Sequence, residues 1–579
     1  MATEEIREII HKLALVNAVN YNGKAQAGAV IGKLLAEKPS LKAEVKAIGS
    51  AVAEIVKEVN RLSLADQKKI VEKNWPEMLV REKVEEEKRL PKLPNVERYE
   101  RVVTRFSPNP DCAIHLGSAR AIVLCSEYAK MYKGTFLLRF EDTDPRLKRS
   151  ALVFYDMIRE DLAWLDCKPD GEFIQSDRIP IYYEYTEKLL KTGNAYVCTC
   201  KPEEFKKKLL AHEPCPDRNL PSEEHLARWQ RMLDGTFKEG EAVVRVKTDL
   251  DHPNPAVRDW PALRIIDPEK HPHPRVGRKY RVWPLYNLST GVDDHLMSIT
   301  HIIRGKEHLT NQTRQEFMYG HLGWRYPEAI HYGRLKITGA LLSKSKILAG
   351  MNEGLFKSWD DPRLATFAAL RRRGIQPDAI KRMIIDIGPK TQDVTLSWDN
   401  LYAYNRKLID SATNRYFFVS TPMQLAVNKV PQNITARLHL HPDHPERGYR
   451  EIKVKQQDGL VSFDVSSNDL KLFKKGNVVR LMELFNVKVL KSGKKGVEAV
   501  YHSQSYEDAR KLNASLIHWL PYETGVPCEV VMPDATMVKG VAEDKCRELK
   551  PSDVVQFERF GFVRIDSVNR AIVAHYAHR

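Results

Sequence analysis

Residues 102–140 decide the fold, and their sequence is VVTRFSPNPDCAIHLGSARAIVLCSEYAKMYKGTFLLRF. Two β-branched and aromatic runs, 102–106 and 135–140, flank a loop rich in proline and a helix that is expected to begin near Ser118. This order predicts a βαβ unit, and therefore a parallel sheet that binds its ligands at the carboxyl ends of the strands.

The composition of the whole chain indicates a large, basic, multidomain protein. Its 579 residues predict three to five domains. The net charge of +16 favours a polyanionic partner, although a bias toward solubility would give the same sign. No apolar run reaches the roughly 20 residues of a membrane span, and the first residues resemble no leader peptide. We therefore expect a cytoplasmic protein with no membrane partner.

The sequences before and after the βαβ unit have different hydrophobic patterns. Before it, apolar residues recur at helical spacing up to a charge run, Arg81 to Arg89, which predicts a helical module. Within that module, residues 28–33 imitate a phosphate loop, but the loop is one residue too short and Leu34 replaces the required hydroxyl, so we reject it as a nucleotide site. Beyond about residue 430, short β-branched runs separated by Gly, Pro, Asn and Lys predict β-barrels.

Two loops carry groups that suit a nucleotide triphosphate. The first places His115 and Gly117 at the start of a helix, where free N–H groups attract anions and glycine permits close approach. The second, at Ser343-Lys344-Ser345, offers a cation and hydroxyls for a leaving pyrophosphate. The alternatives are a packed helix start with a lone histidine and an ordinary basic loop.

The two loops resemble the HIGH and KMSKS signatures of class I aminoacyl-tRNA synthetases, and they occur in the same order along the chain and on the same type of parallel-sheet fold. Ser118 stands where the second histidine of the first signature is usual, and Cys112 stands where glycine is frequent. The resemblance implies that ATP binds with Mg²⁺ and that His115, Ser118 and Lys344 are catalytic. The residues that it implies for the ATP site are Pro108, Asn109, Pro110, His115, Gly117, Ser118, Arg334, Leu335, Ser343, Lys344 and Ser345.

Further segments narrow the resemblance to the glutamyl and glutaminyl subfamily, and within it to the archaeal and eukaryotic type of glutamyl enzyme. They are residues 140–145, Tyr286 in the segment 283–286, residues 331–336 and residues 398–401. The resemblance runs from about residue 96 to the end and implies tRNA as partner and a monomer. The implied domains are a helical N-terminal extension (1–95), the first half of a Rossmann-type catalytic domain (96–195), an acceptor-end binding insertion (196–282), the second catalytic half (283–346), a helical stem-contact region (347–412) and a pair of anticodon-binding β-barrels (413–579).

The charge of one residue favours glutamate over glutamine as the amino acid. Arg304 lies eighteen residues beyond Tyr286, the substrate tyrosine of the subfamily, where glutaminyl enzymes carry a small thiol. A guanidinium matches a carboxylate and leaves a neutral amide poorly satisfied. The resemblance adds Arg105 as a second guanidinium of the pocket and Glu141 as the partner of the α-ammonium group. Two other readings stay open: a glutaminyl enzyme, which Arg304 opposes, and a non-catalytic tRNA-binding paralogue, which Ser118 favours.

Three thiols and an imidazole in the expected insertion suggest a closed structural zinc site. They are Cys198, Cys200, His212 and Cys215. Their spacing is not that of a standard zinc finger, and a set of reduced cysteines in a loop-rich segment is the alternative. Bacterial glutamyl relatives often carry a zinc ion in the corresponding insertion.

Overall fold

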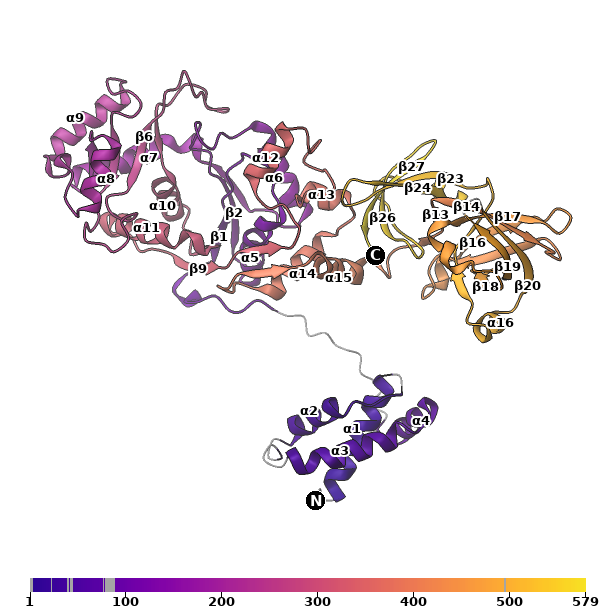
Figure 1. Ribbon diagram of the computed structural model, residues 1–579. Helices are drawn as coiled ribbons and strands as arrows, with labels where there is room; N and C mark the ends of the chain where they lie inside the picture. Colours follow the sequence, from indigo (N-terminus) through magenta and orange to yellow (C-terminus); the bar gives the residue numbers. More distant parts are fainter. Residues whose placement is uncertain are drawn as a thin grey trace. The chain divides into compact units, whose positions relative to one another are not determined.

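The computed structural model describes residues 4–21, 23–38, 41, 45–75, 78, 89–493 and 496–579, and it divides into two compact units, Met1–Lys88 and Arg89–Arg579. Most of the charge run from Arg81 lies outside these ranges. Figure 1 shows a first unit made of helices and a second that contains sheets. No helix in the described ranges has the length and the apolar character that crossing a membrane requires.

The first unit confirms the prediction of a helical N-terminal module. Its helices are α1 (Glu4–Asn20), α2 (Ala27–Glu37), α3 (Val45–Val59) and α4 (Leu64–Asn74). They enclose their own core, in which Ile10, Val30 and Val52 are fully or almost fully buried. The segment that imitates a phosphate loop lies inside α2, where the N–H groups of Ala29 and Val30 already donate to the carbonyl oxygen of Gln26.

The second unit begins with the predicted βαβ arrangement. Strands β1 (Val103–Phe106), β2 (Thr135–Phe140) and β3 (Gly171–Ile174) form a parallel sheet, and α5 (Ala119–Met131) crosses between the first two. Strand β8 (His301–Gly305) pairs in parallel with β9 (Glu328–Tyr332). The N–H of Val103 donates to the hydroxyl of Thr300 at 2.8 Å, and the N–H of Thr300 donates to the carbonyl oxygen of Val103 at 3.0 Å. These two bonds bring the start of β8 beside β1. Residues far apart in the sequence therefore meet where the carboxyl ends of these two neighbouring parallel sheets lie side by side.

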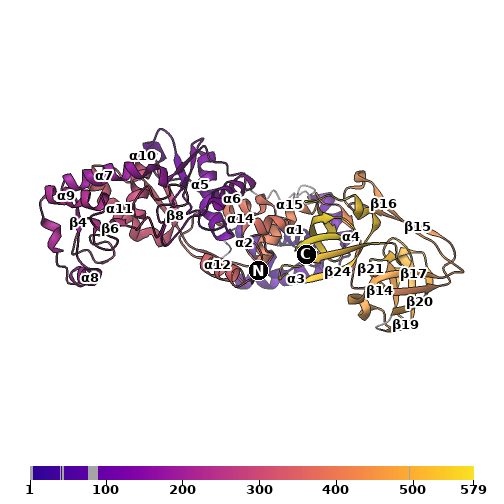
Figure 2. The ribbon, with the colours of Figure 1, turned by 90° about the horizontal axis from the view of Figure 1, so that it is seen from above.

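An antiparallel subdomain is inserted between these two halves. It contains β4 (Ala195–Cys198), β5 (Val243–Val246), β6 (Pro261–Ile265) and β7 (Val282–Pro284), in that order. Helices α7 (Ile179–Lys191) and α9 (Ser222–Leu233) pack beside β4, as Figure 2 also shows, and α8 (Pro202–Leu210) follows that strand. The buried indoles of Trp229, Trp260 and Trp283 belong to its core.

The remaining helices of the second unit lie between the strands of the parallel sheets or follow them toward the C-terminal region. They are α6 (Leu152–Trp164), α10 (Tyr286–Leu296), α11 (Leu309–Leu322), α12 (Lys344–Asn352), α13 (Phe367–Arg372), α14 (Pro377–Ile387) and α15 (Trp398–Ile409), with the short parallel pair β10 (Leu335–Ile337) and β11 (Val394–Leu396). Arg372 forms an ion pair with Asp566 at 2.9 Å, so α13 holds a strand of the C-terminal region.

The C-terminal region confirms the predicted barrel-like sheets. Its strands form two curled seven-stranded sheets, with the orders β12-β25-β26-β27-β23-β24-β13 and β21-β18-β19-β20-β14-β17-β22, beside the ribbon β15-β16 (Figure 1). The bounds are β12 (Arg415–Tyr416), β13 (Phe418–Ser420), β14 (Pro422–Asn428), β15 (Ile434–His439), β16 (Tyr449–Val454), β17 (Val461–Ser466), β18 (Val478–Leu481), β19 (Asn486–Gly493), β20 (Gly496–Ser503), α16 (Tyr506–Lys511), β21 (Ser515–Ile517), β22 (Leu520–Pro521), β23 (Val526–Val531), β24 (Met537–Ala542), β25 (Val554–Phe557), β26 (Gly561–Val568) and β27 (Ile572–His578).

Candidate active site

The loop after β1 presents His115 at the start of a helix. His115 precedes the turn Leu116–Ser118, and its Nδ1 accepts a hydrogen bond from the N–H of Gly117 at 3.0 Å. A side chain at Gly117 would place its Cβ 2.7 Å from the imidazole, so only glycine permits this ring position. Burial lowers the pKa of His115, and the ring is therefore neutral with its proton on Nε2, where it can be donated to a phosphate oxygen.

The second predicted loop meets the first. Lys344, the first residue of α12, forms an ion pair with Asp111, and the hydroxyls of Ser343 and Ser345 lie 3.2 Å apart. Ser118 makes no capping bond with its hydroxyl. The structure thus brings the lysine of one motif to the loop of the other, as a shared triphosphate site requires.

The remaining residues predicted for the ATP site lie in the loop after β1 and at the start of β10. The carbonyl oxygens of Pro108 and Pro110 accept bonds from Glu141 and Ala151, at 2.9 and 3.0 Å. The buried Oδ1 of Asn109 has no hydrogen-bond partner within the described ranges. Arg334 is exposed and Leu335, at the start of β10, is buried.

A compact network of ion pairs lies behind the loop. Asp294 on α10 accepts from Arg105 at 3.0 and 3.2 Å and from Arg139 at 2.7 Å. Arg139 also donates to Glu141 at 3.1 Å, and Thr290 donates to the same oxygen at 3.0 Å. Burial raises the pKa of Glu141, while Arg139 and Arg105 oppose this shift. Arg105 therefore does not stand as a free cation: its charge is already met by Asp294.

Arg304 at the end of β8 has a different environment. Its side chain is 5% exposed, and its hydrogen bonds go to neutral groups, Oε1 of Gln315 at 3.2 Å and the hydroxyl of Tyr326 at 2.9 Å. Within the part of the chain that the structure describes, no acidic side chain forms an ion pair with it. Arg304 is therefore a buried cation whose charge is not cancelled, as a site for a substrate carboxylate requires.

Aromatic groups complete the surroundings of Arg304. The ring of Tyr286, at the start of α10, lies 5.4 Å from that of His308. Burial, and then Glu141, raise the pKa of Tyr286, so it is a neutral hydroxyl. Burial, and then Arg304, lower the pKa of both His308 and His331 to about 4, so neither imidazole adds charge near neutral pH.

Several of these residues escaped sequence reasoning. Thr290 and Asp294 follow Tyr286 at four and eight positions, and this helical spacing on one face of α10 was a usable signal. Gln315 and Tyr326 lie on other elements, and no motif or period marks them. Only the packing of α11 and the segment before β9 against β8 reveals them.

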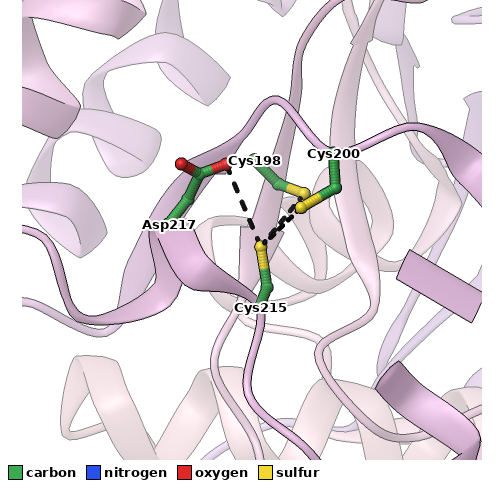
Figure 3. Close-up of side chains that lie close together, drawn as sticks. All are labelled: Cys198, Cys200, Cys215 and Asp217. Carbon is green, nitrogen blue, oxygen red and sulfur yellow. Dashed lines mark hydrogen bonds between the residues drawn. The ribbon is translucent and has the colours of Figure 1, made fainter. Parts of the chain in front are cut away.

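The cysteine cluster forms in the insertion, but with a different fourth member. The Sγ of Cys215 lies 3.5 Å from that of Cys198 and 3.2 Å from that of Cys200 (Figure 3). Asp217 points to the same place, with its Oδ2 3.9 Å from Cys215 Sγ. The prediction of His212 as a ligand needs correction: it lies beyond the end of α8, where its Nδ1 bonds the Asp251 carboxylate at 3.0 Å.

Comparison with known families defines the class of protein. The description "tRNA synthetases class I (E and Q), catalytic domain" matches residues 101–411, which is more than half of the chain. Two anticodon-binding domains of the same group match residues 413–504 and 516–566. The chain therefore belongs to the class I tRNA synthetases of the glutamyl and glutaminyl family.

Full-length relatives narrow the assignment within that family. The chain is 52% identical to a glutamate–tRNA ligase of Pyrococcus furiosus, over 99% of this chain and 100% of that protein. It is 52% identical to the glutamate–tRNA ligase of Thermococcus kodakarensis, over the whole of both. The glutamate–tRNA ligase of Methanothermobacter thermautotrophicus is 45% identical, over 99% and 100%. The chain thus resembles glutamate–tRNA ligases of the archaeal type along its whole length.

Proposed function

We propose that this protein ligates L-glutamate to tRNA through glutamyl-adenylate, consuming ATP and releasing AMP and pyrophosphate. The observation that carries the choice of amino acid is the buried guanidinium of Arg304, which meets only neutral protein groups. A carboxylate removed from water needs such a cation, whereas the neutral amide of glutamine would leave the guanidinium unpaired. The names of the full-length relatives support the same activity.

In the proposed complex the amino acid lies between Arg304 and Glu141. Arg304 binds the side-chain carboxylate, Tyr286 packs beside it, and Glu141 accepts from the α-ammonium group. Glu141 Oε1 already accepts from Arg139 and Thr290, which orients the carboxylate and leaves Oε2 for the substrate. Arg105, which forms an ion pair with Asp294, borders this pocket, and the two charges contribute to the electrostatic potential in it.

ATP lies with its phosphates against the first loop. The Nε2–H of His115 and the N–H groups at the start of α5 bind phosphate oxygens. Lys344 leaves Asp111 to meet the triphosphate, and Mg²⁺ bound with ATP offsets phosphate charge. The α-carboxylate of glutamate attacks the α-phosphorus in line, and the bond to the pyrophosphate leaving group breaks. The terminal ribose of tRNA then attacks the carbonyl carbon of the adenylate and AMP departs.

We also propose one structural zinc ion in the insertion. Ligands about 2.3 Å from zinc at tetrahedral angles have sulfur atoms about 3.8 Å apart, and the observed separations of 3.2 and 3.5 Å are near this value. Asp217 supplies a fourth donor, and Arg228, 2.8 Å from Asp217, offsets the negative charge of the ligand set. These residues fit the ion, and its role would be to fix the fold of the insertion that receives the acceptor end of tRNA.

The experiment that tests the function is ATP–pyrophosphate exchange with glutamate and with glutamine, each with and without tRNA. Exchange with glutamate supports the proposal. Exchange with glutamine alone would indicate the glutaminyl enzyme, and none under any condition would indicate a tRNA-binding paralogue. That the enzyme acts as a cytoplasmic monomer stays a prediction.

A further inference from the structure

We infer that Gln315 and Tyr326 are positioning residues that set the amino-acid preference by holding Arg304 with neutral acceptors. This inference rests on the proposed glutamate pocket. It adds that the preference depends on two residues that do not themselves need to touch the amino acid.

The three side chains form a closed ring of hydrogen bonds. Oε1 of Gln315 accepts from Nη1 of Arg304 at 3.2 Å and from the hydroxyl of Tyr326 at 2.7 Å. The hydroxyl of Tyr326 accepts from Nη2 of Arg304 at 2.9 Å. Each residue thus contacts both of the others, which fixes the plane of the guanidinium. The ring joins β8, α11 and the segment before β9.

The neutrality of this ring is unusual for the pocket. Arg105 and Arg139 meet the carboxylate of Asp294, and Arg178 meets that of Asp293 at 2.8 Å. Oriented by carboxylates, these arginines have their charge cancelled in place. Gln315 is fully buried on α11 and occupies the position from which an acid would cancel the charge of Arg304. An amide there orients the guanidinium and leaves its charge for the substrate.

The ring also contains a polar atom with no local use. Nε2 of Gln315 is buried and has no hydrogen-bond partner among the residues that the structure describes, and the same holds for Nε of Arg304. A buried polar atom without a hydrogen-bond partner lowers the stability of the folded protein. What Gln315 gives in return is a neutral acceptor, Oε1, beside Arg304 and Tyr326.

The test is Gln315→Glu, which changes the charge and almost nothing in shape. We expect kcat/KM for glutamate to fall on the order of 100-fold, mainly through a higher KM, because the new carboxylate pairs with Arg304. The KM for ATP should stay unchanged, and the ratio of glutamine to glutamate use should rise. Gln312→Glu is the matched control: it adds the same charge one turn earlier on α11, at a half-exposed position, and should stay within a few-fold of the wild type.

Two further variants separate charge from packing. Gln315→Met keeps the size of the side chain and removes the acceptor, and Tyr326→Phe removes one hydroxyl. Each should reduce kcat/KM for glutamate by about 10-fold, which is a smaller loss than the one expected for Gln315→Glu. A wild-type KM for glutamate in Gln315→Glu would overturn the inference, and so would an equal loss in Gln315→Met. If Gln315→Glu does not fold, as judged by thermal unfolding, Tyr326→Phe decides, and an unchanged KM there overturns the inference. Failure of the wild type to use glutamate would instead refute the proposed function.

Discussion

Replacing Arg304 with cysteine removes the cation on which the proposed pocket depends. Arg304 is 5% exposed, and the partners of its guanidinium, Gln315 and Tyr326, are neutral. In Arg304→Cys a bound glutamate would therefore keep a buried carboxylate with no counter-charge. Losing one partner of such a pair costs about 3–5 kcal/mol, on the order of a few-hundred- to several-thousand-fold in kcat/KM.

The assay is steady-state charging of tRNA with glutamate and with glutamine. We expect Arg304→Cys to lose glutamate kcat/KM by that factor and to keep the KM for ATP, because His115 and Lys344 lie on other loops. Relative acceptance of glutamine should rise, since its amide no longer faces an unpaired guanidinium. Arg325→Cys, at a largely exposed arginine, is the control. An unchanged glutamate kcat/KM would remove Arg304 from the pocket and with it the main physical reason for choosing glutamate.

Three further results are expected. The double change Cys198→Ser and Cys200→Ser should release about one zinc ion per chain and weaken tRNA binding more than glutamate binding, and metal analysis that finds no zinc in the wild type would refute this. Burial lowers the pKa of His518 to about 4 from 6.5, so the unfolded chain binds the extra proton, and the free energy of unfolding should fall as the pH drops from about 6.5 toward 4; His518→Phe should flatten this part of the profile in thermal unfolding. Reversing the charge of Lys474 and Lys475 should raise the KM for tRNA several-fold and leave the KM for glutamate unchanged. The KM for tRNA should also depend less steeply on salt concentration than in the wild type, and an equal dependence in both proteins would contradict this prediction.

Local pattern was sufficient to predict the layered part of the fold. Residues 102–140 form β1, α5 and β2 as expected, because alternation and helical spacing act within a few residues. The short runs beyond residue 430 are likewise strands. How they assemble into two seven-stranded sheets required the order of pairing, which joins strands such as β12 and β25 across most of the region. No local signal encodes that order.

The fourth member of the cysteine cluster shows the same limit at one residue. His212 was the chemically attractive ligand by type, since imidazole is a common partner of zinc. The chain between Cys200 and Cys215 forms α8, and His212 lies past its end with a left-handed φ of 60° and a bond to Asp251. Asp217 instead follows Cys215 within one short turn, and its carboxylate is held toward the thiols by the N–H and hydroxyl of Thr199.

The proposed glutamate pocket shows why residue type alone could not assign the charges of its arginines. Sequence reasoning placed both arginines in the pocket, Arg304 because its charge matches a carboxylate and Arg105 because the resemblance implies it. In the structure Arg105 pairs with Asp294 at 3.0 Å, whereas Arg304 bonds two neutral groups, so only the second has its charge available. The register of α10 places the counter-ion of Arg105, which is Asp294. The packing of α11 against β8 places the neutral acceptor of Arg304, which is Gln315. The preference for an acidic amino acid is therefore a property of how the arginines are neutralised, and this follows from tertiary contacts that join residues from about 105 to 326.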